Sequence, residues 1–363
     1  MPSLMGLTNS SFDPASRVRF IQFIEDFEKA GWSVDFRPNR PDRQWKSALP
    51  GRPLRAAHYR LGRVAMKWNR AADVRAAAGA DVVFVNRDLA GSGLRLERRL
   101  LRANPRVVFD FDDAIFVGPN EADVAWMCRN AAWVTPGNAY LAEFARRHTD
   151  RVTVVPTVID TRRYTVHPEA QAGGNGRVRV GWSGSDQSIR AALFPSLPML
   201  AELQKRLDFD FVIITNSRPS LPVSDLRWTF VPWKADEEGE IGRFMDAGLM
   251  PLVDDTFQRG KCGLKLLQYM AAGIPTVASP VGVNAEITLH GVTGYLATSP
   301  AEWGSALESL VRSASVRRAM GGAGRDRCVA HYSLERWLPE LLRLFEGVAA
   351  GTRTGREKSS SKR

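Results

Sequence analysis

A short segment in the second half of the chain carries residues suited to holding a phosphate group. Gly260 and Gly263 bracket Lys261 directly before a stretch with helical apolar spacing, and Lys265 follows four residues after Lys261. A helix N-terminus has unpaired N–H groups and a partial positive charge, and glycine lets an anion approach the backbone. Residues four apart lie one helical turn apart, so both ammonium groups can face one anion. Alternatively, both lysines lie on a solvated helix face, and the residues alone leave both interpretations open.

Three carboxylates follow an apolar strand candidate in the first half of the chain. They are Asp110, Asp112 and Asp113, within the sequence VVFDFDDAIF. Carboxylate oxygens at a strand end can ligate a divalent metal ion that carries a nucleoside diphosphate, as in a DxD motif. They can also position an acceptor hydroxyl group or cap the end of the strand, so three interpretations remain open.

Polar residues also follow the first strand candidate. Asn9 stands just after it, and Arg17 and Arg19 open the first predicted helix. Ligands of doubly wound sheets bind at the carboxyl ends of the strands. An arginine at this place can hold a phosphate group of an acceptor through two parallel hydrogen bonds. The alternative is an arginine that simply lies on the surface.

A basic amphipathic helix is predicted from about residue 53 to residue 72. One apolar stripe at helical spacing contains Leu54, Leu61, Val64, Ala65 and Trp68. The basic residues that flank this stripe are Arg55, Arg60, Arg63, Lys67 and Arg70. Such a helix is typical of an anionic membrane surface. Alternatively, the stripe packs on its own domain and the basic face is solvated.

The elements that must position these residues are short apolar runs that alternate with helical patterns. The runs are rich in β-branched residues and bounded by Gly, Pro, Asn or Asp, as buried parallel strands usually are. We expect strands at residues 3–7, 82–85, 107–109, 133–135, 152–155, 178–182, 209–215, 228–230, 249–252 and 276–279. We expect helices at residues 17–30, 94–103, 122–130, 138–148 and 264–272. This alternation predicts an α/β protein with doubly wound parallel sheets.

The segment 166–176 (VHPEAQAGGNG) lacks periodicity and is rich in glycine and polar residues, which predicts a linker. We therefore expect a first domain over residues 1–165 and a second over 177–330, each large enough for an α/β core. Residues 331–350 have helical apolar spacing and are expected to pack back towards the first domain. Residues 351–363 are expected to form a disordered basic tail.

Composition excludes several classes of protein. With 363 residues, 44% hydrophobic and 25% charged, the chain is neither mostly disordered nor collagenous. It has no apolar stretch of about 18 residues and no secretory signal pattern, so we expect no transmembrane helix and no export. The three cysteines are too few and too widely spaced for a disulfide framework or a zinc ribbon. We expect a cytoplasmic protein, with peripheral attachment to the cytoplasmic face of a membrane as a further hypothesis.

The net charge of +11 is concentrated in two segments. Residues 36–70 contain ten Lys or Arg and one acid, and residues 351–363 contain five basic residues and one acid. The remainder is slightly acidic, which argues against a protein that wraps nucleic acid. A nucleic-acid-binding protein that uses Trp45, Tyr59 and Trp68 remains an alternative, but we expect no specific nucleic-acid partner.

The phosphate-binding candidate and its surroundings resemble a known enzyme family. The chain carries Met270-Ala-Ala-Gly273, Val277-Ala-Ser279, Glu286-Ile287 and Gly291-Val-Thr-Gly294 in this order. This pattern resembles the donor-binding region of the group 1, or family 4, glycosyltransferases, which are retaining enzymes of the GT-B fold. Looser matches at residues 154–164, 180–185 and 246–252 extend the resemblance over about residues 151–294.

The chain departs from that family at two positions. The family usually has two glutamates with seven residues between them, and this chain has Gly260 and Gln268 there. The first glutamate is thought to contact the donor sugar and the second the ribose. Gln268 keeps hydrogen-bonding capacity without charge, whereas Gly260 cannot replace a carboxylate. The sequence Arg259-Gly260-Lys261, with Lys265, resembles a lysine-containing branch of the family found among surface-polysaccharide enzymes.

The resemblance implies two Rossmann-like domains that face a cleft, a nucleotide-diphosphate-sugar donor and a glycan or lipid-linked acceptor. It implies no essential metal and no cofactor other than the donor itself. Lys261 and Lys265 would stabilise the leaving diphosphate, and Asp112 would act on the acceptor. The expected donor-binding residues are Gly184, Arg259, Gly260, Gly263, Gln268 and Glu286. The expected acceptor-binding residues are Asn9, Arg17, Arg19 and Asp113.

Other functions remain as alternatives. A metal-dependent transferase would use Asp110 and Asp112, and a degenerate relative would bind a nucleotide sugar without catalysis. An NAD-dependent oxidoreductase also has doubly wound sheets, but no GxGxxG follows the first strand of this chain.

Overall fold

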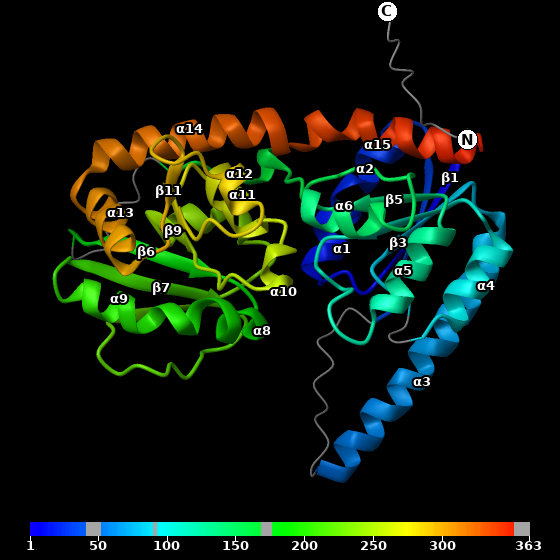
Figure 1. Cartoon of the computed structure of the whole chain (residues 1–363), viewed down its shortest axis with the longest axis horizontal. Coiled ribbons are helices and arrows are strands. Elements are labelled where there is room, and N and C mark those ends of the chain that lie inside the picture. Colours follow the sequence, from blue (N-terminus) through cyan, green and yellow to red (C-terminus); the bar gives the residue numbers. More distant parts are fainter. Residues whose placement is uncertain (41–51, 90–92, 168–175, 352–363) are drawn as a thin grey trace, which may run out of the picture. The chain divides into compact units, whose positions relative to one another are not determined.

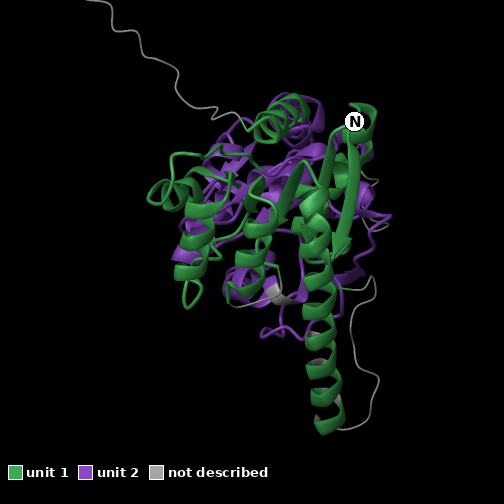
Figure 2. Cartoon of the chain, turned by 90° about the vertical axis from the view of Figure 1, so that its right-hand side faces the viewer, with its two compact units in different colours: residues 1–156, 338–363 green, residues 157–337 purple. Residues whose placement is uncertain are grey.

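The computed structural model describes residues 1–40, 52–89, 93–167 and 176–351. The chain forms two compact units (Figure 2): unit 1 contains residues 1–156 and 338–363, and unit 2 contains residues 157–337. The boundary therefore lies after Pro156, ahead of the linker expected at 166–176. Most of that linker and the expected tail beyond Gly351 lie outside the described residues.

A five-stranded parallel sheet forms the centre of unit 1, in the strand order β2-β1-β3-β4-β5 (Figure 1). Its strands are β1 (Ser3–Thr8), β2 (Ser33–Pro38), β3 (Val82–Asn86), β4 (Val107–Phe111) and β5 (Trp133–Pro136). The strands β3 and β4 are buried along their whole length, which explains their continuous apolar runs. The edge strand β2 is half-exposed, so its polar sequence gave no strand signal.

The helices of unit 1 pack aromatic residues against this sheet. They are α1 (Pro14–Arg19), α2 (Ile24–Lys29), α3 (Arg52–Ala76), α4 (Arg95–Ala103), α5 (Glu121–Asn130), α6 (Ala139–Arg146) and α15 (Leu334–Ala349), which returns the chain to unit 1. The ring of Phe345 on α15 contacts those of Phe27 and Phe84, with centroid distances of 5.5 and 6.3 Å. Phe20 stacks on Phe84 at 5.0 Å. This core therefore includes the segment that was expected to return to the first domain.

Unit 2 is built on a six-stranded parallel sheet in the order β11-β10-β9-β6-β7-β8. Its strands are β6 (Val178–Ser183), β7 (Phe209–Thr215), β8 (Trp228–Pro232), β9 (Ala247–Met250), β10 (Thr276–Ala278) and β11 (Gly294–Leu296). The helices are α8 (Asp186–Ser188), α9 (Leu197–Gln204), α10 (Thr256–Arg259), α11 (Leu264–Ala271), α12 (Asn284–Ile287), α13 (Pro300–Arg312) and α14 (Ala314–Tyr332).

The two faces of this sheet bury separate hydrophobic clusters. Phe211 and Ile213 of β7 pack with residues of α9 and α13. The alternate residues Val212 and Ile214 pack with residues of α11. In Figure 1, α9 lies on one side of the sheet of unit 2 and α11 on the other. Alternate residues of β7 thus face helices on opposite sides of the sheet, and unit 2 is a three-layer α/β structure.

Each sheet has one point where the strand order reverses, and ligands of doubly wound folds bind at the carboxyl end of the strands at such a point. In unit 1 this switch point lies between β1 and β3, and in unit 2 it lies between β6 and β9. Both units thus have the doubly wound α/β architecture that the sequence predicts. Within the described residues, no helix is long and apolar enough to cross a membrane.

Two expected elements differ from the structure. The helix expected at 17–30 is split, because Phe20 leaves the helical conformation with φ −142° and α2 begins only at Ile24. Residues 152–155 form a single bridge to β5, Val134–Val152, and no strand. The carbonyl group of Val155 instead accepts a hydrogen bond from the side chain of Arg19.

Candidate active site

The switch point of unit 2 gathers most of the expected donor-binding residues. Gly184 follows β6 directly, and the segment after β9 leads into α10 and α11. The backbone N–H of Ser183 donates to the hydroxyl group of Tyr269, 2.9 Å away, which ties β6 to α11. Tyr269 is fully buried, and burial raises the pKa of its phenol. The end of β6 is therefore held against the second half of α11.

A glycine lets Lys265 approach the end of β6. A Cβ atom at Gly184 would lie 2.4 Å from the Trp182 ring and 2.8 Å from Cε of Lys265. The Lys265 ammonium group lies 5.2 Å from the centroid of the Trp182 ring, which is a cation–π distance. The prediction that places Gly184 and Lys265 in one site agrees with this geometry. The ring of Trp182 is fully buried and lies against both Gly184 and Lys265.

The start of α11 depends on a second glycine. Gly263 is the N-cap residue with φ +71°, and no side chain caps the helix. A Cβ atom at Gly263 would lie 2.2 Å from the side chain of Ile287. The cap therefore brings no side-chain acceptor to the first N–H groups of α11, which have no intrahelical partner. This is the arrangement in which a helix N-terminus can bind an anion.

The two lysines do not lie one turn apart on the same helix, as the spacing had suggested. α11 begins at Leu264, so Lys261 lies in the loop before it. The Lys261 ammonium group lies 4.7 Å from the centroid of the Phe257 ring on α10. The two ammonium groups thus contact different aromatic rings, Phe257 and Trp182. The loop between α10 and α11 includes the buried Gly260.

Two acidic residues fix the short helix α10. The side chain of Asp255 caps it by accepting from the backbone N–H of Gln258 at 2.8 Å. Asp254 forms a two-point ion pair with Arg259, at 2.6 and 3.0 Å, and this contact lowers the pKa of Asp254. Both Asp254 and Arg259 are exposed. Arg259 is thus positioned at the end of α10 by a surface carboxylate.

A partly apolar pocket lies at the ends of β6, β7 and β8, beside Gln268 of α11. Its polar lining includes Ser183, Lys234 and Gln268, and its apolar lining includes Ile214 and Trp233. The amide group of Gln268 donates to Glu238 at 2.7 Å. The side chain of Gln268 thus lines this pocket, and its role in donor binding stays a prediction. Glu286, in contrast, is exposed on α12.

The structure overturns the expectation that Arg19 binds an acceptor. Arg19 and Asp110 form a buried two-point ion pair with distances of 2.6 and 3.1 Å. The remaining guanidinium hydrogens are donated to the carbonyl groups of Val155, Pro156 and Thr135. Arg19 is therefore a structural residue that links α1 to β4 and to the chain after β5.

The same ion pair argues against a metal site of the DxD type. The carboxylate of Asp110 accepts four hydrogen bonds, two from Arg19 and one each from Asn86 and Thr135. A carboxylate that is already neutralised by a buried guanidinium group is a poor ligand for a second cation. Among the described residues, no group of three acidic, histidine or cysteine side chains is arranged to hold a metal ion.

Asp112 and Asp113 are held by an arginine that sequence reasoning did not identify. Arg87 follows β3 and bonds to Asp112 at 2.9 Å and to Asp113 at 2.7 Å. Although burial lowers the pKa of Arg87, the neighbouring carboxylates prevail and raise it. Its φ of +67° is the only positive value for a non-glycine residue in the described part of the chain. Such backbone strain clusters at functional sites, and no sequence signal predicts it.

This arginine lies at the switch point of unit 1. The end of β1, where Asn9 stands, borders β3, where Arg87 follows. Asn9 and Arg17 are partly exposed, as expected for residues that could meet an acceptor. At this edge of unit 1, the partly accessible residues are Asn9, Arg17, Asp112 and Asp113. Arg19 is not among them, because it is buried.

Arg70 does not belong to the solvated face of the basic helix. Its side chain is fully buried and donates to the carbonyl groups of Thr8, Arg37 and Leu89, at 2.6, 3.0 and 3.1 Å. Burial lowers the pKa of Arg70. Arg70 therefore anchors α3 to the carboxyl ends of β1 and β2, and it cannot contribute to a membrane surface.

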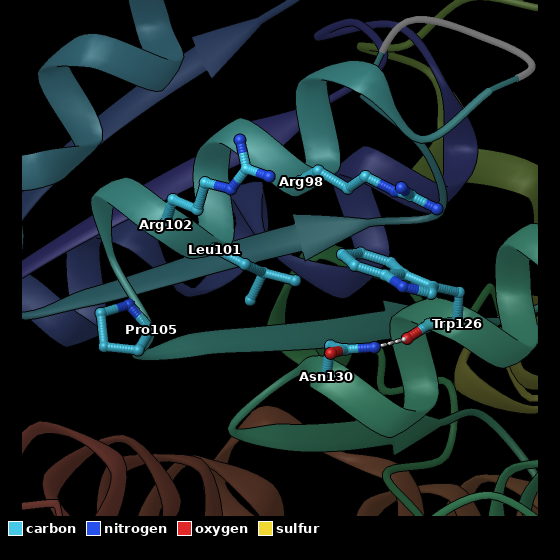
Figure 3. Close-up of a pocket in the computed structure, with 6 residues that line it drawn as sticks. All are labelled: Arg98, Leu101, Arg102, Pro105, Trp126 and Asn130. Atoms are coloured by element: carbon cyan, nitrogen blue, oxygen red, sulfur yellow. Dashed lines mark hydrogen bonds between the residues drawn. The ribbon is translucent and has the colours of Figure 1, made fainter.

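An open hollow between α4 and α5 lies at the other edge of the sheet of unit 1 (Figure 3). Its lining includes Arg98, Arg102, Pro105 and Trp126. The guanidinium group of Arg98 lies 5.3 Å from the centroid of the Trp126 ring. Pro105 lies two residues before β4, so the hollow borders the amino ends of the strands. Ligands of doubly wound sheets bind at the opposite, carboxyl edge, and this hollow is not part of the candidate site.

Comparison with known proteins agrees with this architecture. Residues 187–313, which include α10 and α11, match the model of the family described as glycosyl transferases group 1. No curated protein matches the chain.

Solved structures share the fold at low sequence identity. A sucrose-phosphate synthase from Thermosynechococcus elongatus aligns with a TM-score of 0.72 and 17% identity, over 97% of this chain and 100% of that chain. HepE of Anabaena, solved with UDP and glucose, aligns with a TM-score of 0.66 and 14% identity, over 95% of this chain and 99% of that chain. A glycosyltransferase from Rickettsia africae aligns with a TM-score of 0.67 and 10% identity, over 96% and 98%. The chain has the GT-B fold, and the match of residues 187–313 to a glycosyltransferase family model identifies it as a glycosyltransferase.

Proposed function

We propose that this glycosyltransferase moves a sugar from a nucleoside-diphosphate sugar to a hydroxyl group of a glycan or a lipid-linked acceptor. The observation that carries the proposal is the uncapped N-terminus of α11 at the switch point of unit 2. Lys261 and Lys265 lie beside it, within the segment that matches the family model. Surface-polysaccharide or lipid-linked oligosaccharide synthesis is the setting that the lysine-containing pattern favours.

The diphosphate of the donor would bind at the first N–H groups of α11. Lys261 and Lys265 would then balance the negative charge that grows on the diphosphate as its bond to the anomeric carbon breaks. Aromatic rings hold both ammonium groups in place, so little reorganisation is needed at that moment. The oxygen that leaves the sugar would accept the proton of the incoming hydroxyl group, which gives retention without a dedicated protein base.

The nucleoside would occupy the pocket beside α11. Trp233 and Ile214 offer apolar surface for a base, and Ser183 and Gln268 offer hydrogen-bonding groups. HepE, one of the structures that share the fold, was solved with UDP, so uridine is the first nucleoside to test. Gln268 is already engaged by Glu238, which positions its amide group and leaves its carbonyl oxygen for the ribose hydroxyls.

The acceptor would meet the edge of unit 1. Arg87 holds Asp112 and Asp113 together there, and Asn9 and Arg17 border the same switch point. We propose that Asp112 accepts a hydrogen bond from the acceptor hydroxyl and orients it. Because Arg19 satisfies the Asp110 carboxylate, the reaction proposed requires no metal ion at Asp110.

The proposal is tested by thermal unfolding of the purified protein with UDP, GDP, ADP or NAD, each with and without EDTA. A ligand at about 100 times its Kd adds about 2.7 kcal/mol to the stability of the folded state, or about 5–10 °C in a domain of this size. We expect one nucleoside diphosphate to raise the melting temperature with EDTA present. Lys261→Ala should remove most of that increase. Lys205→Ala is the matched control, because Lys205 is exposed after α9 and pairs with surface acids.

Three results would contradict the proposal. A shift that requires a metal ion and Asp112 would favour a metal-dependent transferase. A shift with NAD alone would favour an oxidoreductase. A metal-independent shift with UDP, but no release of UDP from any UDP-sugar in the presence of glycan acceptors, would favour a relative that binds nucleotide sugars without catalysis.

A further inference from the structure

The first half of α3 presents large apolar side chains to solvent. Leu61 and Trp68 are 72% and 75% exposed, and Leu54 and Val64 are also exposed. Leu54, Leu61 and Trp68 are seven residues apart, so they lie on one face of the helix. In Figures 1 and 2 this half of α3 extends beyond the sheet and the other helices of unit 1. We name the four residues the α3 stripe.

The α3 stripe faces away from the domain that carries it. Arg70, which is fully buried in unit 1, lies two residues after Trp68 and therefore about 200° around the helix axis. Val74, one turn after Arg70, is also buried. The second half of α3 thus anchors the helix through the face opposite the stripe. The expectation that the stripe packs on its own domain does not hold.

Positive charge lies beside the α3 stripe. The sequence of α3 contains seven basic residues against one acid, Asp73. Arg60 and Lys67 are exposed, and each precedes a stripe residue, which places it about 100° from the stripe. The neighbouring helix α4 packs against α3 and adds four exposed arginines to the same unit, namely Arg95, Arg98, Arg99 and Arg102.

We propose that α3 docks unit 1 on an anionic lipid bilayer, with the α3 stripe inserted among the head groups and the basic residues facing lipid phosphates. Leucine and tryptophan on one face with lysine and arginine beside them are the composition of interfacial helices. A second copy of this chain would bring two helices of like charge together, and that repulsion disfavours self-association. The proposal goes beyond the glycosyl transfer proposed above and does not depend on the donor site.

The test is co-sedimentation of the full chain with vesicles. One set contains phosphatidylcholine alone and the other contains about 30% phosphatidylglycerol. We expect binding to the anionic set, and loss of most binding at about 0.5 M salt because salt screens the charges. Leu61→Asp with Trp68→Asp should weaken binding at least about tenfold, since two large apolar side chains no longer insert. Arg60→Gln with Lys67→Gln should weaken it about tenfold as well.

The control substitution is Val329→Asp, which replaces an exposed valine on helix α14 of unit 2 by the same acid. It should leave vesicle binding unchanged. All variants should keep the melting temperature and its increase with nucleotide, which separates loss of docking from loss of folding or of the donor site. Equal binding to both vesicle sets, no binding at all, or unchanged binding of the Leu61 and Trp68 variant would overturn the proposal. A dimer that this variant abolishes, without vesicle binding, would assign the α3 stripe to a second copy instead.

Discussion

Glycine is the residue type on which the candidate donor site depends most, and Gly263 is the position where the dependence is sharpest. An alanine there would adopt φ +71°, which costs about 1–2 kcal/mol, and its Cβ would lie 2.2 Å from Ile287. We expect Gly263→Ala to lower the free energy of unfolding by at least that amount in urea titrations. We also expect it to reduce the melting-temperature increase given by nucleotide, because the start of α11 must shift.

Gly322 is the matched position for that prediction. It lies within α14, and a Cβ there would meet no atom within 4 Å. Gly322→Ala should therefore stabilise the protein by about 0.5–1 kcal/mol, since alanine lowers the entropy of the unfolded chain. If Gly263→Ala and Gly322→Ala changed the free energy of unfolding by the same amount and sign, the prediction that Gly263 requires a glycine would be wrong.

Glu97 gives a prediction that depends on pH. The side chain is buried, one oxygen accepts from the N–H of Leu89, and the other has no partner among the described residues. Burial raises the pKa of Glu97. A raised folded-state pKa means that stability is greatest below the unfolded pKa of 4.5 and falls as pH rises through the folded pKa. The glutamine of Glu97→Gln stays neutral. The melting temperature of this variant should therefore increase relative to that of the wild type as pH rises from about 4 to 8.

Glu302 is the control with the opposite sign. It is an exposed capping residue of α13, and hydrogen bonds from Ser299 and Thr298 lower its pKa. Its contribution is present above the unfolded pKa and is lost as pH falls through the folded pKa. Glu302→Gln should therefore be less stable than the wild type at neutral pH, with a difference that shrinks in acid. Parallel pH profiles for the two variants would contradict both assignments.

Arginine is the residue type for which sequence reasoning was least informative. Gly263 and Lys265 could be predicted to belong to an anion-binding segment, because glycines and lysines at the start of a helix are typical of one, whereas Gly184 followed from the family resemblance alone. The structure brings Gly184 and Lys265 together. Arg19 and Arg70 read as surface or ligand-binding residues, and both are buried. A buried arginine needs several acceptors that the fold collects from distant positions, and one sequence does not reveal them. Arg87 was missed for a related reason, since its positive φ is a property of the backbone alone.

At the scale of elements, Arg19 holds four segments of unit 1 together. It joins α1 to β4 through Asp110, to β5 through the carbonyl group of Thr135, and to the chain beyond β5 through Val155. Arg19→Met would leave the Asp110 carboxylate buried without its cation. We expect a loss of about 3–5 kcal/mol in the free energy of unfolding by urea.

Two further variants test whether the ion pair causes this effect. Arg19→Met combined with Asp110→Asn should be more stable than Arg19→Met alone, because no charge is then left unpaired. Arg37→Met is the control, since Arg37 pairs with Asp35 and Asp73 near the surface and should cost less than about 1 kcal/mol. A loss for Arg19→Met no larger than that for Arg37→Met would show that the buried pair does not hold these elements.

The elements that could be predicted are those whose burial alone determines their sequence. β3 and β4 are buried on both faces, so they appear as apolar runs. β2 is a half-exposed edge strand, and its polar sequence is typical of a loop. The expected helix at 17–30 has continuous helical spacing, but Phe20 turns into the aromatic core beside Phe84, and the helix breaks there. Tertiary packing of one large side chain thus overrides a local pattern.

At the scale of the whole molecule, two doubly wound units carry different chemistry. The residues proposed to bind the donor belong to unit 2, whereas the α3 stripe belongs to unit 1. Hydrogen exchange should therefore give a separate footprint for each ligand. Saturating nucleoside diphosphate should slow exchange at the end of β6 and at the start of α11, and leave α3 unchanged. Anionic vesicles should slow exchange in the first half of α3, where large apolar side chains are exposed, and leave α11 unchanged.

The two footprints separate the proposals from each other. Protection by nucleotide confined to the strand ends of unit 1 would move the donor site to Arg87, Asp112 and Asp113, and would make Lys261 a residue of the solvated surface. Protection of α3 by nucleotide as strongly as by vesicles would mean that the helix responds to folding stability as a whole and not to lipid. Separate footprints are expected because the anion-binding N-terminus and the exposed apolar stripe have no residue in common.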